Sequence, residues 1–198
     1  MTIETVTVSR NDGISETLPD VALTPGGKLV CIYRESDTDF VRYFSGVAVR
    51  TSIDGGHSWS ERRPIVESRS DVAEEVEKWN RPHVQVMEDG RLLALCDVFP
   101  AVPGADTDHT NSHVVLWWSD DEGETWSDSE HTDVIGLVPD RVIELPSGAW
   151  LLATCVRMKE GSYDRQGRTV QIAHRSEDRG KTWQGPYVVG EHDRYDLS

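Results

Sequence analysis

The sequence predicts an all-β protein, a β-propeller of four-stranded antiparallel blades, with about three blades in this chain. Three observations support this prediction. One eight-residue motif occurs three times, a glycine-containing hairpin pattern precedes each copy, and no long helical period competes with the short apolar runs. Units of roughly 40–50 residues with four short strands are typical of propeller blades. We therefore expect residues 1–198 to form a single partial propeller domain.

The repeated motif reads Ser-x-Asp-x-Gly-x-Ser/Thr-Trp, as SIDGGHSW at 52–59, SDDEGETW at 119–126 and SEDRGKTW at 176–183. Three equivalent copies indicate a structural role rather than catalysis. We expect the aspartates to accept hydrogen bonds from loop amides and the glycines to supply a conformation that a Cβ disfavours. The tryptophans should pack between sheets, each contributing roughly 3–5 kcal/mol. These structural residues are Asp54, Gly56, Trp59, Asp121, Gly123, Trp126, Asp178, Gly180 and Trp183.

The four strands of each unit follow in a fixed order. Two apolar runs flank a turn containing Gly27, Gly90 or Gly148, a third run leads into the motif, and an extended stretch follows it. We place the blades at about 15–62, 80–130 and 138–190. The run at 2–9 has strand composition and is expected to form an additional N-terminal strand, and the segment 71–79 to form one or two helical turns.

Composition narrows the partners and the compartment. A net charge of −15 argues against nucleic acid or an anionic membrane as the main partner. No apolar run is long enough to cross a membrane, and the N-terminus has no signal-peptide pattern. We expect a soluble protein, cytoplasmic by default. Cys31, Cys96 and Cys155 lie in apolar runs and are interpreted as small buried side chains, without a disulfide framework.

Meander topology separates the connecting loops into two groups. Turns joining strands one and two, and three and four, share one face with the motif. The long polar loops joining strands two and three share the other, where ligand sites are favoured. Six arginines lie there, which are Arg34, Arg42, Arg81, Arg157, Arg165 and Arg168. They predict an anion-binding patch. The alternative is pairing with nearby acids, which are Glu35, Asp37, Asp39, Asp97 and Asp164.

The motif is the Asp-box, and three copies at this spacing resemble the sialidase (neuraminidase) superfamily of six-bladed propellers over nearly the whole chain. The chain is similar to the N-terminal half of that fold. The stretch VCIYRESDTD resembles the family's first blade, which implies that Arg34 positions the sugar and that Asp39 is the acid/base, with Asp37 as the fallback. By the same resemblance Asp108 lines the sugar pocket, Arg157 ends the equivalent strand of the third blade, and Arg81 opens the second.

The resemblance has one clear departure. Thr17 stands where the family has the first arginine of the triad that binds the sugar carboxylate. The other two arginines, the nucleophilic tyrosine and the glutamate that activates it have no match in this chain. We therefore expect an incomplete portion of a site, which needs the remaining blades or a second copy of the chain to close the propeller.

The resemblance implies a sialidase-like glycoside hydrolase that removes a terminal acidic sugar from a glycan. The acid/base protonates the leaving oxygen, and arginines bind the sugar carboxylate. No metal or cofactor is expected, and a Ca²⁺ site at 106–109 is disfavoured against a solvated loop. The histidines, including His83, show no shared ligand spacing and are assigned no chemistry. The alternatives are a noncatalytic propeller that binds a glycan or a protein, and a purely structural repeat module.

Overall fold

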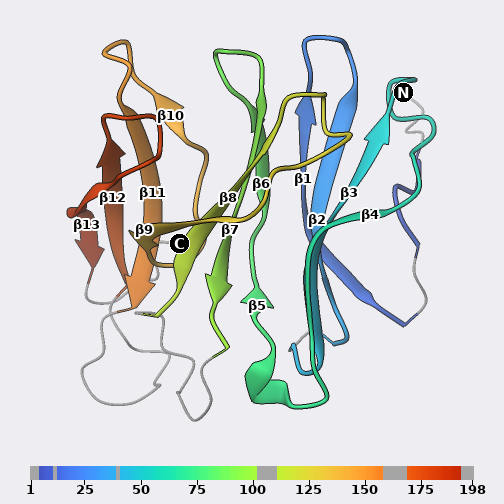
Figure 1. The fold of residues 1–198 in the computed structure, drawn as a ribbon, viewed down its shortest axis with the longest axis horizontal. Coiled ribbons are helices and arrows are strands. Elements are labelled where there is room, and N and C mark those ends of the chain that lie inside the picture. Colours follow the sequence, from blue (N-terminus) through green and yellow to red (C-terminus); the bar gives the residue numbers. More distant parts are fainter. Residues whose placement is uncertain (1–4, 11–12, 39–40, 102–110, 158–168, 193–198) are drawn as a thin grey trace.

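The computed structural model describes the chain except residues 1–4, 11–12, 39–40, 102–110, 158–168 and 193–198. It contains three antiparallel sheets arranged one after another, each a propeller blade (Figure 1). The first blade has the order β1 (Ser15–Leu23), β2 (Leu29–Ser36), β3 (Phe44–Ser52) and β4 (Arg63–Arg69). The prediction of an all-β propeller with about three blades is confirmed.

The second and third blades repeat this meander. In the second, β7 (Leu92–Phe99), β8 (His113–Ser119) and β9 (Glu130–Ile135) follow in order. Both β5 (Lys78–Trp79) and β6 (His83–Val86) pair with β7. The third has the order β10 (Ile143–Glu144), β11 (Trp150–Arg157), β12 (Thr169–Ser176) and β13 (Gln184–His192). One short 3-10 helix, η1 (Ala73–Glu75), lies in the segment where helical turns were expected.

The blade boundaries differ from the sequence prediction at the outer strands. β4 runs to residue 69, β9 to 135 and β13 to 192, each beyond the predicted end. The reason is that these strands are largely exposed, so hydrophobic alternation marks them weakly. Residues 5–10, within and just after the expected N-terminal strand, contain no strand. Val8 there packs instead against the buried cluster of Cys31, Tyr33 and Ala48.

The motif folds the turn between the third and fourth strands. In the first copy, Ser52 Oγ accepts the Gly56 N–H at 2.9 Å, and Asp54 accepts both the N–H and the hydroxyl of Ser58 at 2.9 and 2.6 Å. Trp59 Nε1 donates to the Gly56 carbonyl at 3.1 Å. The serine and aspartate bonds recur in the other copies, at Ser119, Asp121, Gly123 and Thr125, and at Ser176, Asp178, Gly180 and Thr182.

The motif aspartates predict a loss of stability in acid. Burial acts to raise the pKa of Asp121, but the hydroxyl and the amide of Thr125 lower it to about 2. A carboxylate with a lowered folded-state pKa stabilises the fold above its unfolded value of 3.8, and this contribution is lost as pH falls toward 2. We expect Asp121→Asn to cost about 1 kcal/mol or less at pH 7, because the side chain is exposed, and only a small fraction of that at pH 2. Urea unfolding at both pH values measures this, and an equal cost at both would contradict it.

The core lies between the blades. β7 is buried on both faces: Leu92, Ala94 and Cys96 pack toward the first blade, and Leu93 and Leu95 toward the third. The most buried tryptophans are Trp79 and Trp117, each 1% exposed, with ring centroids 5.3 Å apart. Neither belongs to the motif. The motif tryptophans are only partly buried at the edges of the clusters, so we expect them to contribute less than the sequence argument gave them.

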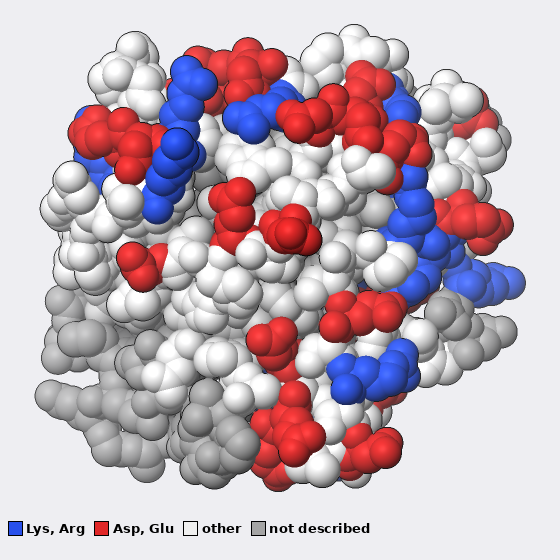
Figure 2. Space-filling view, viewed as in Figure 1, with Lys and Arg blue, Asp and Glu red and all other residues white. Residues whose placement is uncertain are grey.

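The two faces of the blades carry different loops, as expected. Hairpin turns and the motif turns lie along one edge of the molecule, and the longer connections after β2, β7 and β11 leave from the opposite edge (Figure 1). Acidic side chains gather along the turn edge with lysines and arginines among them (Figure 2). Glu124 there pairs with Lys28 and Arg63 of the first blade. Within the described part of the chain, no helix is long and apolar enough to cross a membrane.

Candidate functional site

The second strands of the three blades carry three different groups at one equivalent position. Arg34, Asp97 and Cys155 each lie seven residues after the turn glycine of their blade. All three lie near the end of the strand from which the long loops leave. The scaffold repeats, but this position does not, which is the pattern expected where a site is built on a repeated fold.

Asp97 joins the second and third blades through its carboxylate. Its side chain is 0% exposed. Oδ1 accepts the backbone N–H of Arg81 at 3.0 Å, and Oδ2 accepts the side-chain amide of Asn80 at 2.9 Å and the backbone N–H of Val138 at 3.3 Å. Burial raises the pKa of Asp97 above its usual value, although these donors oppose the shift. The carboxylate thus fixes the backbone just before β6 in the second blade and ahead of β10 in the third.

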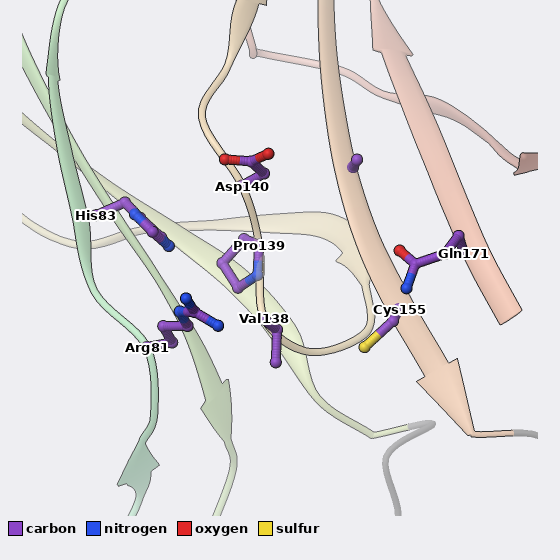
Figure 3. Close-up of a pocket in the computed structure, with 8 residues that line it drawn as sticks. Arg81, His83, Val138, Pro139, Asp140, Cys155 and Gln171 are labelled. Carbon is purple, nitrogen blue, oxygen red and sulfur yellow. The ribbon is translucent and has the colours of Figure 1, made fainter. Parts of the chain in front are cut away.

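We call the Asp97 carboxylate, with the Arg81 and Val138 N–H groups that it holds, the Asp97 clamp. A cavity of about 260 Å³ opens directly beside it (Figure 3). Arg81 and Val138, whose N–H groups Asp97 holds, both line it. The volume lies just below the roughly 300–1,000 Å³ of sites for drug-sized ligands, so it suits a small ligand. Its lining mixes cationic, anionic, amide and apolar groups, from Arg81, His83, Val138, Pro139, Asp140, Ala153, Cys155 and Gln171.

Arg81 presents a guanidinium to the cavity without an acidic partner among the described residues. Elsewhere in the described part of the chain, several arginines form ion pairs with acidic side chains. These are Arg62 with Glu35, Arg63 with Glu124, Arg91 with Asp89, Arg141 with Asp20 and Arg175 with Glu177. In a chain with a net charge of −15, a guanidinium left unpaired beside a cavity is notable. A planar guanidinium binds carboxylates through two parallel hydrogen bonds, so Arg81 suits an anionic ligand.

His83 faces the same cavity and belongs to a network that spans all three blades. Its Nδ1 lies 3.2 Å from Asp20 Oδ2 of β1, and Asp20 also accepts from Arg141 of the third blade at 2.9 Å and from the Val84 N–H at 3.1 Å. Burial acts to raise the pKa of Asp20, but the bonds from His83, Val84 and Arg141 hold it below its usual value. Asp20 is therefore an ionised, fully engaged acceptor.

The residues predicted from sequence are only partly placed in this site. Arg81 lines the cavity. Arg34 lies in β2, opposite Thr17 in the register with β1, and is not part of the cavity lining. Arg157 ends β11, opposite Thr169, and is likewise not part of the lining. Asp39 and Asp108 lie outside the described residues, so the proposed acid/base and the proposed pocket acid stay predictions.

The fallback acid, Asp37, has a structural role in its loop. Its two oxygens accept the backbone N–H groups of Arg42 and Tyr43 at 3.0 and 2.9 Å. Burial acts to raise its pKa, but these amides hold it below the usual value. A general acid needs a proton at working pH, and a lowered pKa removes it. The geometry therefore disfavours Asp37 as the acid.

The alternative interpretation was that nearby acids pair with the arginines of the predicted patch. Three of those acids are described, and their hydrogen bonds go to other groups. Glu35 is 0% exposed and pairs with Arg62, whose Nε approaches at 2.8 Å. Asp37 and Asp97 accept backbone and amide donors, as described above. Asp39 and Asp164 lie outside the described residues. The buried cysteines were interpreted correctly as small core side chains, although Cys155 also borders the cavity.

Sequence reasoning missed Asp20, His83 and Arg141. A signal was present, because each lies four residues before the carbonyl that accepts the hairpin-turn hydrogen bond, at Thr24, Met87 or Leu145. Aligning the three hairpins on that turn puts a carboxylate, an imidazole and a guanidinium at one position. No group of three or more histidine, cysteine or acidic side chains in the described residues is arranged to hold a metal ion. The expectation of a site without metal or cofactor stays a prediction.

Comparisons with known proteins agree with the fold. The model of the BNR repeat-like domain matches residues 27–192. A Hadza microbial sialidase, Hz136, has 20% identity and a TM-score of 0.64, over 89% of this chain and 37% of its own. A protein of unknown function from Dyadobacter fermentans has 17% identity and a TM-score of 0.67, over 90% of this chain and 56% of its own.

An α-L-arabinanase from Penicillium chrysogenum, complexed with arabinobiose, has 17% identity and a TM-score of 0.60, over 90% of this chain and 50% of its own. At these identities the likeness shows the fold alone. The chain spans between 37% and 56% of the length of these three structures. A comparison with curated proteins gave no match.

Proposed function

The chain belongs to the BNR repeat-like domain family, and from that premise we propose that it forms part of a sialidase-like glycoside hydrolase that removes a terminal acidic sugar. One observation supports this most directly: Arg81, whose backbone N–H is held by Asp97, presents to a small cavity of mixed polarity a guanidinium that has no acidic partner among the described residues. Known glycosidases with a similar fold include both a sialidase and an arabinanase, so the fold accommodates acidic and neutral sugars.

The roles follow from the chemistry of such a sugar. In this proposal Arg81 binds its carboxylate from the cavity, Arg34 positions the sugar from outside the cavity lining, Arg157 and Asp108 border the ring, and Asp39 protonates the leaving oxygen. A carboxylate beside the reacting carbon repels an anionic nucleophile, so a neutral nucleophile deprotonated on attack suits this substrate. That group comes from further blades or from a second copy of the chain. Exposed apolar side chains at Tyr187, Val188 and Val189 of β13 give such a partner a surface. Light scattering, which gives the mass in solution, separates the two sources.

The sugar site is tested by binding measurements on Arg81→Ala. We expect the chain to bind N-acetylneuraminate more tightly than neutral L-arabinose in titration calorimetry. Arg81→Ala should weaken N-acetylneuraminate binding roughly 10–100-fold, because a charge-assisted hydrogen bond contributes about 1.5–3 kcal/mol. Lys181→Ala removes the same charge from a motif turn and should have little effect. Equal binding by Arg81→Ala would remove Arg81 from the site. Absence of binding to either sugar by the unaltered chain would overturn the proposal.

A second candidate function is a noncatalytic glycan-binding propeller. The observation that favours it is Thr17, a hydroxyl where the resemblance implies a carboxylate-binding arginine. Its Oγ1 is buried and has no hydrogen-bond partner in the described part of the chain. Release of 4-methylumbelliferone from sialoside and arabinofuranoside substrates separates the two candidates, since a binding module holds the sugar without turning it over.

A further inference from the structure

We propose that His83, oriented by Asp20, accepts a hydrogen bond from a ligand hydroxyl in the cavity, so that the cavity takes a hydroxyl-bearing carboxylate of the sugar-acid class. The inference rests on the proposed function in placing this pair within the glycan site. It adds a residue and a recognition mode that the resemblance to sialidases does not supply.

The tautomer of His83 follows from its partner. Asp20 is ionised and can only accept, so the Nδ1 atom 3.2 Å away must carry the proton. In the neutral imidazole, Nε2 then holds the lone pair. No hydrogen bond to Nε2 is formed by the described residues, and the ring points into the cavity beside Arg81 and Pro139 (Figure 3). The cavity therefore contains an oriented acceptor whose partner is not supplied by those residues.

Asp20 is itself held so that it cannot turn away from His83. Oδ2 accepts the Val84 N–H at 3.1 Å as well as His83, and Oδ1 accepts the Val21 N–H and Arg141 Nη2, each at 2.9 Å. These donors come from all three blades. An imidazole fixed this way loses little rotational freedom on binding, which favours a specific hydrogen bond.

The neighbouring charges define the ligand. Arg81 supplies a cation for a carboxylate, and Asp140, which lines the opposite side, is a second acceptor of hydroxyl protons with one oxygen bonded to the Arg141 N–H. A cation that shares the lining with two hydroxyl acceptors fits a small molecule that carries both a carboxylate and several hydroxyl groups. A carboxylate alone would supply no donor to His83 Nε2 or to the second oxygen of Asp140.

The tautomer is tested first, by long-range ¹H–¹⁵N NMR of the imidazole at a pH where it is neutral. We expect His83 to carry its proton on Nδ1. A proton on Nε2 would overturn the proposal, whether or not any sugar binds. This readout does not depend on the ligand, so it separates failure of the Asp20–His83 pair from failure of the proposed function.

Recognition is tested with two anions, D-glucuronate and cyclohexanecarboxylate, which has no hydroxyl groups. His83→Asn keeps a donor to Asp20 but removes the group at Nε2, whereas His83→Gln places an amide oxygen near that position. We expect His83→Asn to weaken D-glucuronate binding roughly five- to tenfold and to leave cyclohexanecarboxylate unchanged, and His83→Gln to restore part of the loss.

The outcomes separate recognition from structure. Equal weakening of both anions by His83→Asn would mean that His83 only maintains the fold, and no weakening of either would mean that it is not in the site. Both results overturn the inference and leave the proposed function standing if the unaltered chain binds N-acetylneuraminate. Binding of neither anion by the unaltered chain would overturn the inference, whereas the N-acetylneuraminate titration decides the proposed function.

Discussion

Trp79→Ala is expected to lower the free energy of unfolding by about 3–5 kcal/mol, the range for truncating a fully buried aromatic side chain. Trp79 is 1% exposed between the first and second blades and packs against Trp117 with ring centroids 5.3 Å apart. Its backbone N–H donates to Ser45 Oγ of the first blade at 3.0 Å. Removing the indole leaves a cavity where two sheets meet, and strands on both sides limit its collapse.

Two further variants make the prediction specific. Trp79→Phe should cost less than Trp79→Ala, because the buried Trp79 indole N–H has no hydrogen-bond partner among the residues that the structure describes, so its loss carries no penalty. Trp59→Ala, in the motif, should cost about 1–2 kcal/mol, since a partly buried side chain removes less area from water. Urea unfolding followed by far-ultraviolet circular dichroism compares the three. A cost for Trp59→Ala as large as for Trp79→Ala would restore the sequence-based view that motif tryptophans dominate.

The fold was predictable because each blade repeats the same local signals. The motif turn depends on contacts within eight residues, from Ser52 to Trp59, so the sequence pattern contains its whole hydrogen-bond plan. The outer strands were harder to delimit. In β13, Tyr187, Val188 and Val189 are 51–69% exposed, so no alternation between buried and exposed positions marks where the strand ends.

The candidate site was less predictable because its contacts join distant parts of the chain. The Asp20–His83 bond spans 63 residues and the Asp20–Arg141 bond spans 121. Ligand spacing along the sequence cannot detect such a group, so the histidine was left without a role. Arg81 was found because its position at the start of a blade follows from the repeat alone. Its link to Asp97 depends on how two strands of one blade meet, and the link from Asp97 to Val138 on how two blades meet.

Asp97 is expected to have the largest combined effect on stability and binding. Asp97→Ala leaves the side-chain amide of Asn80 and the backbone N–H groups of Arg81 and Val138 without an acceptor in a site that is 0% exposed. Each unsatisfied buried donor costs about 1–3 kcal/mol, so we expect a loss of roughly 3–5 kcal/mol after relaxation. Amide hydrogen exchange at Arg81 and Val138 should accelerate more than at the motif turns, and unchanged exchange there would contradict a clamp.

Asp97→Asn separates the charge of the clamp from its shape. Because burial raises the folded-state pKa of Asp97 above 3.8, the folded protein binds this proton more tightly than the unfolded chain does. The contribution of Asp97 to stability is therefore greatest below its unfolded pKa and declines as pH rises through the folded one. Asparagine has no such dependence, so the stability advantage of the unaltered protein over Asp97→Asn should grow as pH falls from 7 to 4.

The other carboxylates titrate alike in both proteins, so their contributions cancel in this difference, which urea unfolding at a series of pH values measures. A difference independent of pH would mean that Asp97 titrates in the fold as it does in the unfolded chain. A folded-state pKa raised by burial means instead that the charge is retained at neutral pH at a cost in stability, and the positions of Arg81 and Val138 beside the cavity are what it maintains. On that account Asp97→Asn weakens N-acetylneuraminate binding even under conditions where the variant is fully folded, because the guanidinium that binds the carboxylate loses its fixed backbone.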